Sequence, residues 1–334
     1  MFSRIAKYSL ICFFLLAILL AAVLPGVAAA DTAVAQPSQP GPYHIGYYTA
    51  LFYVIPYGIY NATIRYPAKY DGWLAPKDTS GGTYPGIAIS DGSMGTSWMI
   101  DWIPEHLTTY GYVTICFTPP NTLSMDTQQW AQGCNKAIVT LKSENTRCLS
   151  PMRGLLNTDK FGVMGHSMGG AGVIEAASAN PEIDAVVALA PGADNGSLAQ
   201  YFVRTTQDCA LVSVPIQMQV GSNDGDVLPA WVDEYYNLIP NTTDKEQLVI
   251  TGANHIGFYD EDVVWLFDWM ITFGLDNPAS ISIAQQHLVS ERYYTAWFQY
   301  YLKGMTGYET YISGSAAQND LNTGVLTALE YNNP

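Results

Sequence analysis

The chain has 334 residues, of which 49% are hydrophobic and only 13% are charged, which excludes an intrinsically disordered chain, a collagen and a coiled coil. Its formal net charge is 14 − 29 = −15 at pH 7. Phosphate backbones repel a surface this acidic, so we expect no nucleic-acid partner. The low charge favours substrates that are neutral or apolar.

The N-terminus has the pattern of an export signal. Arg4 and Lys7 precede an apolar run from Tyr8 to Leu24, and Ala28-Ala29-Ala30 offers a small-residue cleavage site. This order predicts a signal peptide over residues 1–30 and a secreted, extracellular protein. The apolar run of 17 residues is slightly long, so an uncleaved anchor is the alternative. After signal removal we expect no stable membrane span.

Four cysteines follow the signal, namely Cys116, Cys134, Cys148 and Cys209. In an oxidising compartment an even number permits up to two disulfide bonds. Cys134 and Cys148 lie on either side of a predicted helix end and are the favoured disulfide pair. The sequence contains no CxxC motif and no Cys/His cluster, so we expect no metal site.

The remaining chain alternates between short strands and longer helices. Residues 31–42 are small, polar and proline-containing, and predict a linker. Strands are expected at Ala62–Tyr66, Gly86–Ser90, Val113–Phe117, Phe161–Met164, Ala185–Ala190, Ile216–Val220 and Gln247–Thr251, and helices at Ser97–Tyr110, Thr127–Ser143, Gly170–Asn180, Pro229–Leu238 and Ser290–Lys303. This alternation predicts an α/β fold over residues 43–312, with a mostly parallel central sheet flanked by helices. Residues 313–334 form a polar C-terminal tail to which we assign no structure.

A candidate nucleophile lies in Gly165-His166-Ser167-Met168-Gly169, a G-x-S-x-G sequence between a predicted strand and a predicted helix. In that context the motif is a nucleophile elbow, a tight turn that exposes the serine, and its glycines let neighbouring backbone pass closely. The alternative is an ordinary glycine-rich turn. We select Ser167 as the nucleophile because candidate partners follow later in the chain.

A neutral serine needs a base, and one of the five histidines fits best. His255 follows the predicted strand Gln247–Thr251 through a short loop of small residues. The other four lie before the first predicted strand, within a helix, beside the nucleophile, or in a region without a preceding strand: His44, His106, His166 and His287. Position and chain order therefore select His255.

The acid that orients the base is expected after the penultimate strand. That strand runs into Gly221-Ser222-Asn223-Asp224-Gly225-Asp226. Asp224 is favoured because it directly follows the strand-edge Gly-x-x, and Asp226 is the alternative acid. A calcium loop or a solvated turn is a further interpretation of the two aspartates. The order Ser167, Asp224, His255 is typical of α/β-hydrolases.

Acyl transfer also needs hydrogen-bond donors for the developing oxyanion. One is expected to be the backbone N–H of Met168, directly after the nucleophile, and the other an N–H in the loop after Gly86–Ser90. In that loop we select Ser93, with its neighbour Met94 as the alternative. The same loop also fits a capping turn before the next helix.

Five segments carry a resemblance to a known family: Gly41-Pro42-Tyr43, Thr63–Pro67, Ile87–Ser90, Val163–Gly170 and Gly252–His255. Together they resemble secreted bacterial cutinases and, more broadly, the polyester-hydrolase group of the α/β-hydrolase superfamily, which includes enzymes acting on poly(ethylene terephthalate). The similarity runs from about Gly41 to Ile256 and resumes around Tyr294–Lys303. It implies a cofactor-free serine esterase acting on a polyester, cutin or lipid-like ester, with His166, Met94 and Gly192 near the substrate.

Three features differ from the family pattern. Ser93 and Gly192 stand where the family has aromatic residues that flank the substrate ring, and the loop carrying the acid is one residue longer. Residues 257–289 intervene before the last predicted helix and are rich in aromatic side chains, such as Tyr259 and Trp269. This insertion is either a lid or wall beside His255 or a surface element packed on the sheet.

The combined prediction is a secreted, monomeric serine carboxylic-ester hydrolase of the cutinase or polyesterase type, which uses a Ser-His-Asp triad and an acyl-enzyme intermediate. A lipase, a dienelactone-hydrolase-like or an acetylhydrolase-like enzyme for small esters is the alternative. A non-enzymatic alternative is an inactive hydrolase scaffold used for surface binding. An intact set of Ser167, Asp224 and His255 argues against that scaffold.

Overall fold

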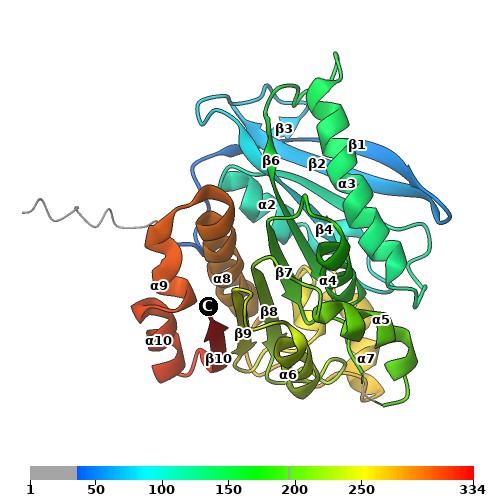
Figure 1. The fold of residues 1–334 in the computed structure, drawn as a ribbon, viewed down its shortest axis with the longest axis vertical. Coiled ribbons are helices and arrows are strands. Elements are labelled where there is room, and N and C mark those ends of the chain that lie inside the picture. The colour runs from blue at the N-terminus through cyan, green and yellow to red at the C-terminus, as the bar shows by residue number, and fades with distance from the viewer. Residues whose placement is uncertain (1–35, 195) are drawn as a thin grey trace, which may run out of the picture. The chain divides into compact units, whose positions relative to one another are not determined.

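The structure is a computed structural model that describes residues 36–194 and 196–334. The predicted signal peptide, residues 1–30, and the first part of the predicted linker lie outside the described residues. The described chain is built around a ten-stranded sheet with the order β10-β9-β8-β7-β6-β4-β5-β2-β1-β3 (Figure 1).

The middle of the sheet is parallel and antiparallel pairs flank it on both sides, with the two-residue edge strand β3 pairing parallel with β1. The strands are β1 (His44–Val54), β2 (Gly58–Ala68), β3 (Gly72–Trp73), β4 (Tyr84–Ser90), β5 (Val113–Thr118), β6 (Leu156–His166), β7 (Ala185–Leu189), β8 (Ile216–Gly221), β9 (Lys245–Ile250) and β10 (Leu326–Asn332). From β5 through β4, β6, β7 and β8 to β9 all neighbours are parallel, whereas β2 pairs antiparallel with β1 and β5, and β10 pairs antiparallel with β9.

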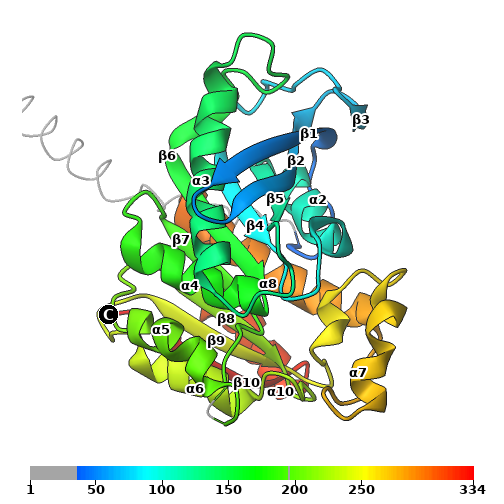
Figure 2. The ribbon, with the colours of Figure 1, turned by 90° about the vertical axis from the view of Figure 1, so that its right-hand side faces the viewer.

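Helices cover both faces of the sheet (Figure 2). The helical elements are η1 (Ser97–Ile100), α2 (Trp102–Thr109), α3 (Gln128–Thr146), α4 (Met168–Ala179), α5 (Ala199–Cys209), α6 (Pro229–Leu238), η2 (Ile256–Phe258), η3 (Val264–Phe267), α7 (Asp268–Thr272), α8 (Ile283–Lys303), η4 (Thr306–Tyr308), α9 (Glu309–Ile312) and α10 (Ser315–Asn322). Contacts group α3, α4, α5 and α6 as one layer and pack α2 against α8 on the other side. The short helices η3 and α7 belong to the segment that was predicted as an insertion.

Burial explains why β4 and β7 are nearly uninterrupted apolar runs, whereas β8 and β9 also bury polar side chains such as Gln217 and Glu246. Every residue of β4, β7, β8 and β9 is buried, because helices cover both faces of this part of the sheet. Strand β1, next to the short edge strand β3, instead alternates, with Phe52 buried and its neighbours Leu51 and Tyr53 exposed. Such alternation is expected when only one face of a strand packs on the core.

The α/β-hydrolase fold predicted from the sequence is confirmed. All seven predicted strands form, and the helix predicted over Pro229–Leu238 has those bounds. The sequence analysis missed β1, β3, β10 and α5, and it began the last long helix at Ser290 although α8 begins at Ile283. For the two-residue strand β3 the reason is its length, because the strand character of so short a segment depends on a partner elsewhere in the chain.

The C-terminal residues close one edge of the sheet. Leu326 pairs with Ile250 and Glu330 pairs with Gln247, in an antiparallel ladder. The segment described above as an unassigned tail therefore supplies α10 and an edge strand.

The described end of the predicted linker lies against α2. The hydroxyl of Tyr110 donates to the carbonyl oxygens of Gln36 and Gln39, both at 2.8 Å, and the Gly41 N–H donates to Thr109 Oγ1 at 2.8 Å. Nε2 of His106 lies 2.7 Å from the Pro37 carbonyl oxygen. Residues 36–42 are therefore held by specific contacts to α2 and to Tyr110, which follows it.

The predicted Cys134–Cys148 disulfide is absent, which corrects the sequence prediction. Cys116, Cys134, Cys148 and Cys209 are all free thiols, and Cys148 alone among these four is exposed. Cys134 lies inside α3 and Cys148 follows its C-terminal end. At a rise of 1.5 Å per residue, the part of α3 from Cys134 to its end at Thr146 is about 18 Å long. A disulfide needs Cα atoms within about 7 Å of each other.

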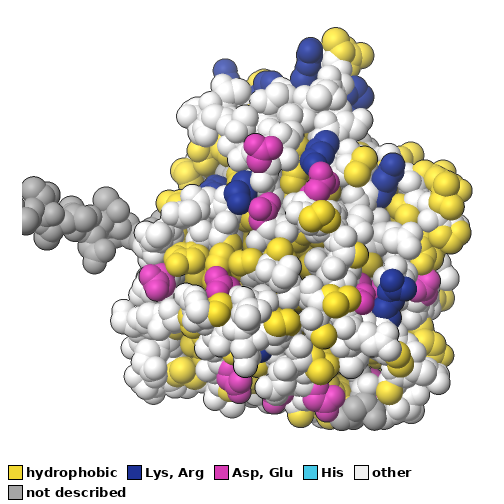
Figure 3. Space-filling model, in the orientation of Figure 1, with side chains coloured by type: hydrophobic (Ala, Val, Ile, Leu, Met, Phe, Trp, Pro, Cys, Tyr) yellow, Lys and Arg dark blue, Asp and Glu magenta, His cyan; other side chains and the backbone are white. Residues whose placement is uncertain are grey.

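Charged side chains are scattered over the face of the molecule seen in Figure 3, and Lys and Arg form no continuous patch there. Among the residues that the structure describes, no helix combines the length and the apolar character that crossing a membrane requires.

Candidate active site

Ser167 occupies the sharp turn between β6 and α4. Its backbone has φ 54° and ψ −120°, and a positive φ is strained for a residue with a side chain. A Cβ on Gly169 would lie 2.6 Å from the carbonyl oxygen of Ser90, so this position needs glycine. The Ser167 N–H donates to the Leu189 carbonyl oxygen at 2.9 Å and ties the turn to β7. This geometry is that of a nucleophile elbow.

His255 and Asp224 form a buried pair at the ends of β9 and β8. Nδ1 of His255 lies 3.0 Å from Oδ2 of Asp224, and each residue is 2% exposed. The other oxygen of Asp224 accepts the N–H groups of Asp226, at 3.1 Å, and Val227, at 2.7 Å. The carboxylate is therefore fixed by three hydrogen bonds and can hold the imidazole in one orientation.

Asp226, the alternative acid, lies on the other side of the same ring. Its Oδ2 is 3.4 Å from Nε2 of His255, and its side chain is 40% exposed. The structure thus brings Asp224 to Nδ1, the nitrogen that an orienting acid contacts, and Asp226 to Nε2, the nitrogen that faces a nucleophile in a serine triad. The two aspartates have different positions and cannot exchange roles.

The loop after β4 packs directly against the elbow. A Cβ on Gly92 would lie 2.5 Å from Cβ of Ser167, so this close approach requires glycine. The Met94 N–H donates to the Thr122 carbonyl oxygen at 2.6 Å and is not free for an oxyanion. The Ser93 N–H has no acceptor among the described residues, which favours Ser93 over Met94 as the second donor beside Met168.

A cavity of about 540 Å³ joins these groups. Ser167, Met168, Ser93 and His255 all line it, together with aromatic side chains from α5, α6 and the insertion: Phe202, Trp231, Tyr259, Phe267 and Trp269. The rings of Tyr259 and Phe267 stack, with centroids 4.1 Å apart. The cavity therefore combines an apolar wall with a small set of convergent polar groups, as ligand sites usually do.

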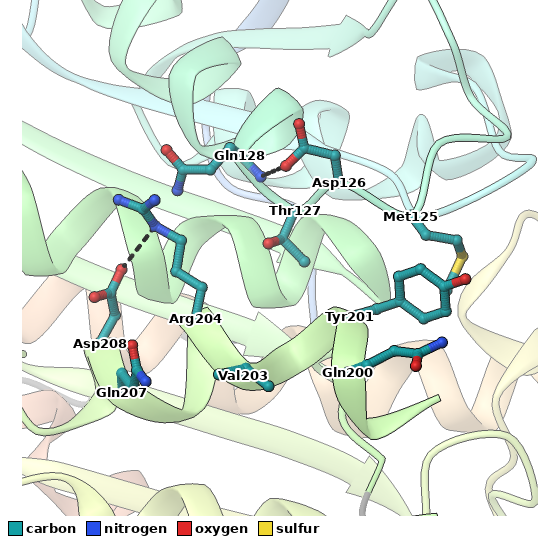
Figure 4. Close-up of a pocket in the computed structure, with 10 residues that line it drawn as sticks. All are labelled: Met125, Asp126, Thr127, Gln128, Gln200, Tyr201, Val203, Arg204, Gln207 and Asp208. Carbon is teal, nitrogen blue, oxygen red and sulfur yellow. Dashed lines mark hydrogen bonds and ion pairs between the residues drawn. The ribbon is translucent and has the colours of Figure 1, made fainter. Parts of the chain in front are cut away.

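A second hollow of about 780 Å³ lies between the start of α3 and α5 (Figure 4). Arg204 and Asp208 face each other there, 3.6 Å apart, and Met125 lines both hollows. Its lining within the described chain contains no serine, cysteine or histidine. The first cavity is therefore the candidate active site.

Comparison with known proteins agrees with this geometry. The sequence profile of a PET hydrolase-like family matches residues 55–325, most of the described chain. The chain belongs to the PET hydrolase-like family. The family resemblance stated from sequence motifs is thereby confirmed.

Curated relatives in this family carry hydrolase names. The chain is 29% identical over 220 residues to cutinase est1 of Thermobifida alba and 30% identical over 218 residues to cutinase est2 of the same organism, and each match covers 63% of this chain and 64% of the relative. It is 27% identical over 242 residues to the bis(hydroxyethyl) terephthalate hydrolase of Streptomyces coelicolor, covering 69% of each chain. The match thus spans less than two thirds of the two cutinases.

This member of the PET hydrolase-like family builds its aromatic wall from α5, α6 and the segment that contains Trp269. Gly192 and Met94 line the cavity, but Gly192 brings no ring there. A Cβ on Gly192 would lie 2.7 Å from the ring of Phe202, which occupies the adjacent space. Trp269 of the insertion lines the cavity as well, so the insertion is a wall of the site rather than a distant surface element.

His166 does not contact the cavity, which corrects its assignment as a substrate contact. It is fully buried, with Nδ1 3.2 Å from Oδ1 of Asp91 and its ring centroid 4.7 Å from that of His255. His166 ends β6, and the turn at Ser167 points the two side chains in different directions. The ring of His166 therefore packs against the ring of His255.

Asp276 is a candidate functional residue that the sequence analysis missed. Its Oδ1 accepts the Gly225 N–H at 2.9 Å, and its Oδ2 accepts the Ile256 N–H at 3.1 Å. It therefore connects the loop that carries Asp224 to the loop that carries His255. An Asp before a helix in sequence suggests only a cap or a turn, so no local signal marks this role.

Electrostatics of the site favour a charged imidazole. Burial alone lowers the pKa of His255, but the carboxylates of Asp224 and Asp226 outweigh burial and raise that pKa above its ordinary value. Burial lowers the pKa of neighbouring His166 well below its ordinary range, so His166 stays neutral. The two adjacent rings therefore differ in their affinity for a proton, and His255 is the one that can accept it.

No group of three or more His, Cys, Asp or Glu side chains with metal-binding geometry occurs in residues 36–194 and 196–334.

Proposed function

We propose that the protein is a serine carboxylic-ester hydrolase with Ser167 as nucleophile, His255 as base and Asp224 as orienting acid. The observation that carries the proposal is the buried Asp224–His255 contact of 3.0 Å beside a strained serine in the same cavity. Membership of the PET hydrolase-like family and relatives named as cutinases support the same activity.

The proposed reaction proceeds through an acyl-enzyme. Oγ of Ser167 attacks the ester carbonyl carbon while Nε2 of His255 accepts the hydroxyl proton. The N–H groups of Met168 and Ser93 bind the oxyanion. The carbon–oxygen bond to the alcohol then breaks, and the imidazolium returns its proton to the leaving alkoxide. Water repeats the sequence, with His255 again as base, and releases the acid and free Ser167.

The substrate class follows from the cavity wall. Aromatic rings such as Trp231, Tyr259 and Trp269 favour an apolar ester, and the described lining contains no Lys or Arg that would bind an anionic group. We propose a neutral ester of the cutin or polyester kind. A soluble small ester is the second candidate, because the insertion adds a wall to the cavity and limits the space beside His255.

Secretion is part of the proposal. The basic, apolar and small-residue pattern of residues 1–30 supports export and cleavage after Ala30. Sequencing the N-terminus of protein recovered from the culture medium tests this, with Asp31 as the expected first residue. We also propose that the secreted enzyme is a monomer, which its mass in solution tests.

The decisive assay is hydrolysis of p-nitrophenyl butyrate by the chain from Asp31 onward. Ser167→Ala, His255→Ala and Asp224→Ala should each lower kcat/KM by about 10³-fold or more. Ser313→Ala and His44→Ala are matched controls on exposed residues away from the cavity and should retain wild-type rates. A folded wild-type protein that turns over no ester would refute the activity, and full activity in Ser167→Ala would refute the assigned nucleophile.

A further inference from the structure

The carboxylate of Asp226 has no role in the reaction proposed above, although it touches the base. We propose that Asp226 is a specificity-determining residue: its carboxylate competes with substrate for Nε2 of His255 and makes the site discriminate against esters that carry a negative charge. This inference rests on the proposed esterase function and concerns which esters the same site accepts.

The first support is the position of the carboxylate. Oδ2 of Asp226 lies 3.4 Å from Nε2 of His255, and the residue lines the cavity together with Ser167. Its backbone is fixed, because its N–H donates to Oδ1 of Asp224 at 3.1 Å. Among the described residues, its carboxylate has no close partner other than the imidazole. The backbone thus keeps Asp226 beside Nε2 of His255, while its partly exposed side chain can rotate away.

The second support is how the two nitrogens of His255 are occupied. When the ring carries two protons, Nδ1 donates to Asp224 and Nε2 faces Asp226, so both N–H groups have a carboxylate partner. A base must instead present Nε2 without a proton to the nucleophile. Asp226 therefore stabilises the protonated resting ring, and substrate binding has to displace it.

Other ionisable groups around His255 do not replace this effect. Asp276 approaches from the segment before α8, Asp91 from the end of β4 and neutral His166 from the end of β6. Asp276 and Asp91 are buried and bonded to backbone N–H groups. Asp226 is the one exposed carboxylate among these groups, so it alone can move when substrate enters.

The third support is the charge of the cavity. Its described lining includes the carboxylates of Asp194 and Asp226 and no Lys or Arg. A substrate carboxylate would therefore meet like charges in a site partly screened from water, where they repel more strongly than in solution. A cationic group would meet a carboxylate and the faces of Trp231 and Trp269, an arrangement that favours cations.

The test compares three acyl esters of p-nitrophenol: methyl glutarate (neutral), glutarate (anionic) and 4-(trimethylammonio)butyrate (cationic). Wild type should prefer the neutral and cationic esters. Asp226→Asn, which keeps the size but removes the charge, should raise the anionic-to-neutral ratio of kcat/KM by about tenfold. Asp262→Asn on the exposed part of the insertion makes the same charge change away from the cavity and should leave the ratio unchanged.

A pH profile gives a second readout. Removing Asp226 lowers the pKa of His255, so the acidic limb of kcat/KM should move to lower pH by about one pH unit. If the wild type is active and Asp226→Asn has the same ester ratio and the same acidic limb, the inference is overturned while the proposed function stands. Loss of all turnover in a folded Asp226→Asn also overturns it, because Asp226 would then belong to the catalytic machinery.

If the folded wild type hydrolyses no ester, the proposed function itself fails. The contact can still be tested by NMR titration of the His255 ring in wild type and Asp226→Asn. A lower His255 pKa in the variant supports the contact between Asp226 and the ring, and an unchanged pKa refutes it.

Discussion

Gly92 approaches Ser167 so closely that position 92 has no room for a side chain. A Cβ on Gly92 would lie 2.5 Å from Cβ of Ser167 and 3.0 Å from its Oγ. The loop that carries the proposed oxyanion donor Ser93 is thereby placed directly against Ser167. Neither residue is near the other in sequence, and the contact depends on β4 and β6 being adjacent in the sheet.

This contact predicts the effect of Gly92→Ala. The added methyl group must push the loop away from Ser167, which displaces the Ser93 N–H from the oxyanion. We expect kcat to fall by roughly 10²-fold or more, as when an oxyanion donor is removed, with a smaller change in KM. Steady-state kinetics with p-nitrophenyl butyrate measures this, alongside thermal unfolding. Wild-type kcat in the variant would show that this loop takes no part in catalysis.

Asp276→Ala should uncouple the loop that carries Asp224 from the loop that carries His255. The change removes the acceptors for the N–H groups of Gly225 and Ile256, and unsatisfied buried donors cost about 1–3 kcal/mol each. We expect a lower free energy of unfolding in urea and a kcat reduced by roughly tenfold or more. Asp276→Asn keeps one acceptor oxygen and should lie between wild type and Ala. Equal kcat in all three proteins would contradict the positioning role.

Trp269→Ala should weaken substrate binding more than chemistry. Trp269 lines the cavity, whereas Trp265 of the same insertion is 64% exposed and outside it. We expect KM for p-nitrophenyl esters to rise by roughly tenfold in Trp269→Ala, because buried apolar contact area is lost, with kcat nearly unchanged. Trp265→Ala is the matched control and should keep the wild-type KM. Equal KM values in both variants would mean that the insertion does not bind substrate.

Glu246 predicts a pH-dependent stability. Its side chain is buried in β9. Oε2 accepts a hydrogen bond of 2.5 Å from Nε2 of Gln217, and Oε1 has no hydrogen-bond partner among the described residues. Burial raises its pKa well above the ordinary value. Because the folded state disfavours the charged form, stability should fall as pH rises above about 4.3, where the unfolded chain ionises.

Glu246→Gln removes this pH dependence. Its free energy of unfolding should exceed that of wild type at pH 8, because the neutral Gln side chain carries no charge for burial to penalise. The two proteins should converge near pH 4, where Glu246 is protonated in both states. Urea unfolding at the two pH values measures the difference. A variant that is less stable than wild type at pH 8 would contradict the prediction.

Local sequence determined the elbow, because all of its requirements lie in one short segment. A strand, Gly165-His166-Ser167-Met168-Gly169 and a helix follow one another directly, and backbone sterics alone make this turn expose Ser167. Chain order extended the prediction to His255 and Asp224, since loops at the same edge of a parallel sheet converge. The alternation of apolar strands and helices likewise determined the fold class.

Tertiary structure decided what depends on distances between remote segments. Which aspartate faces Nδ1, how Asp276 links two loops, and whether Cys134 can reach Cys148 all follow from where helices and strands are packed. The aromatic wall is the clearest case, because Trp269 reaches the cavity only when the insertion folds back beside Ser167 and His255. The pattern of side chains along the sequence predicts burial and local conformation. Contacts between residues far apart in the chain depend on how helices and strands pack, which no short stretch of sequence determines.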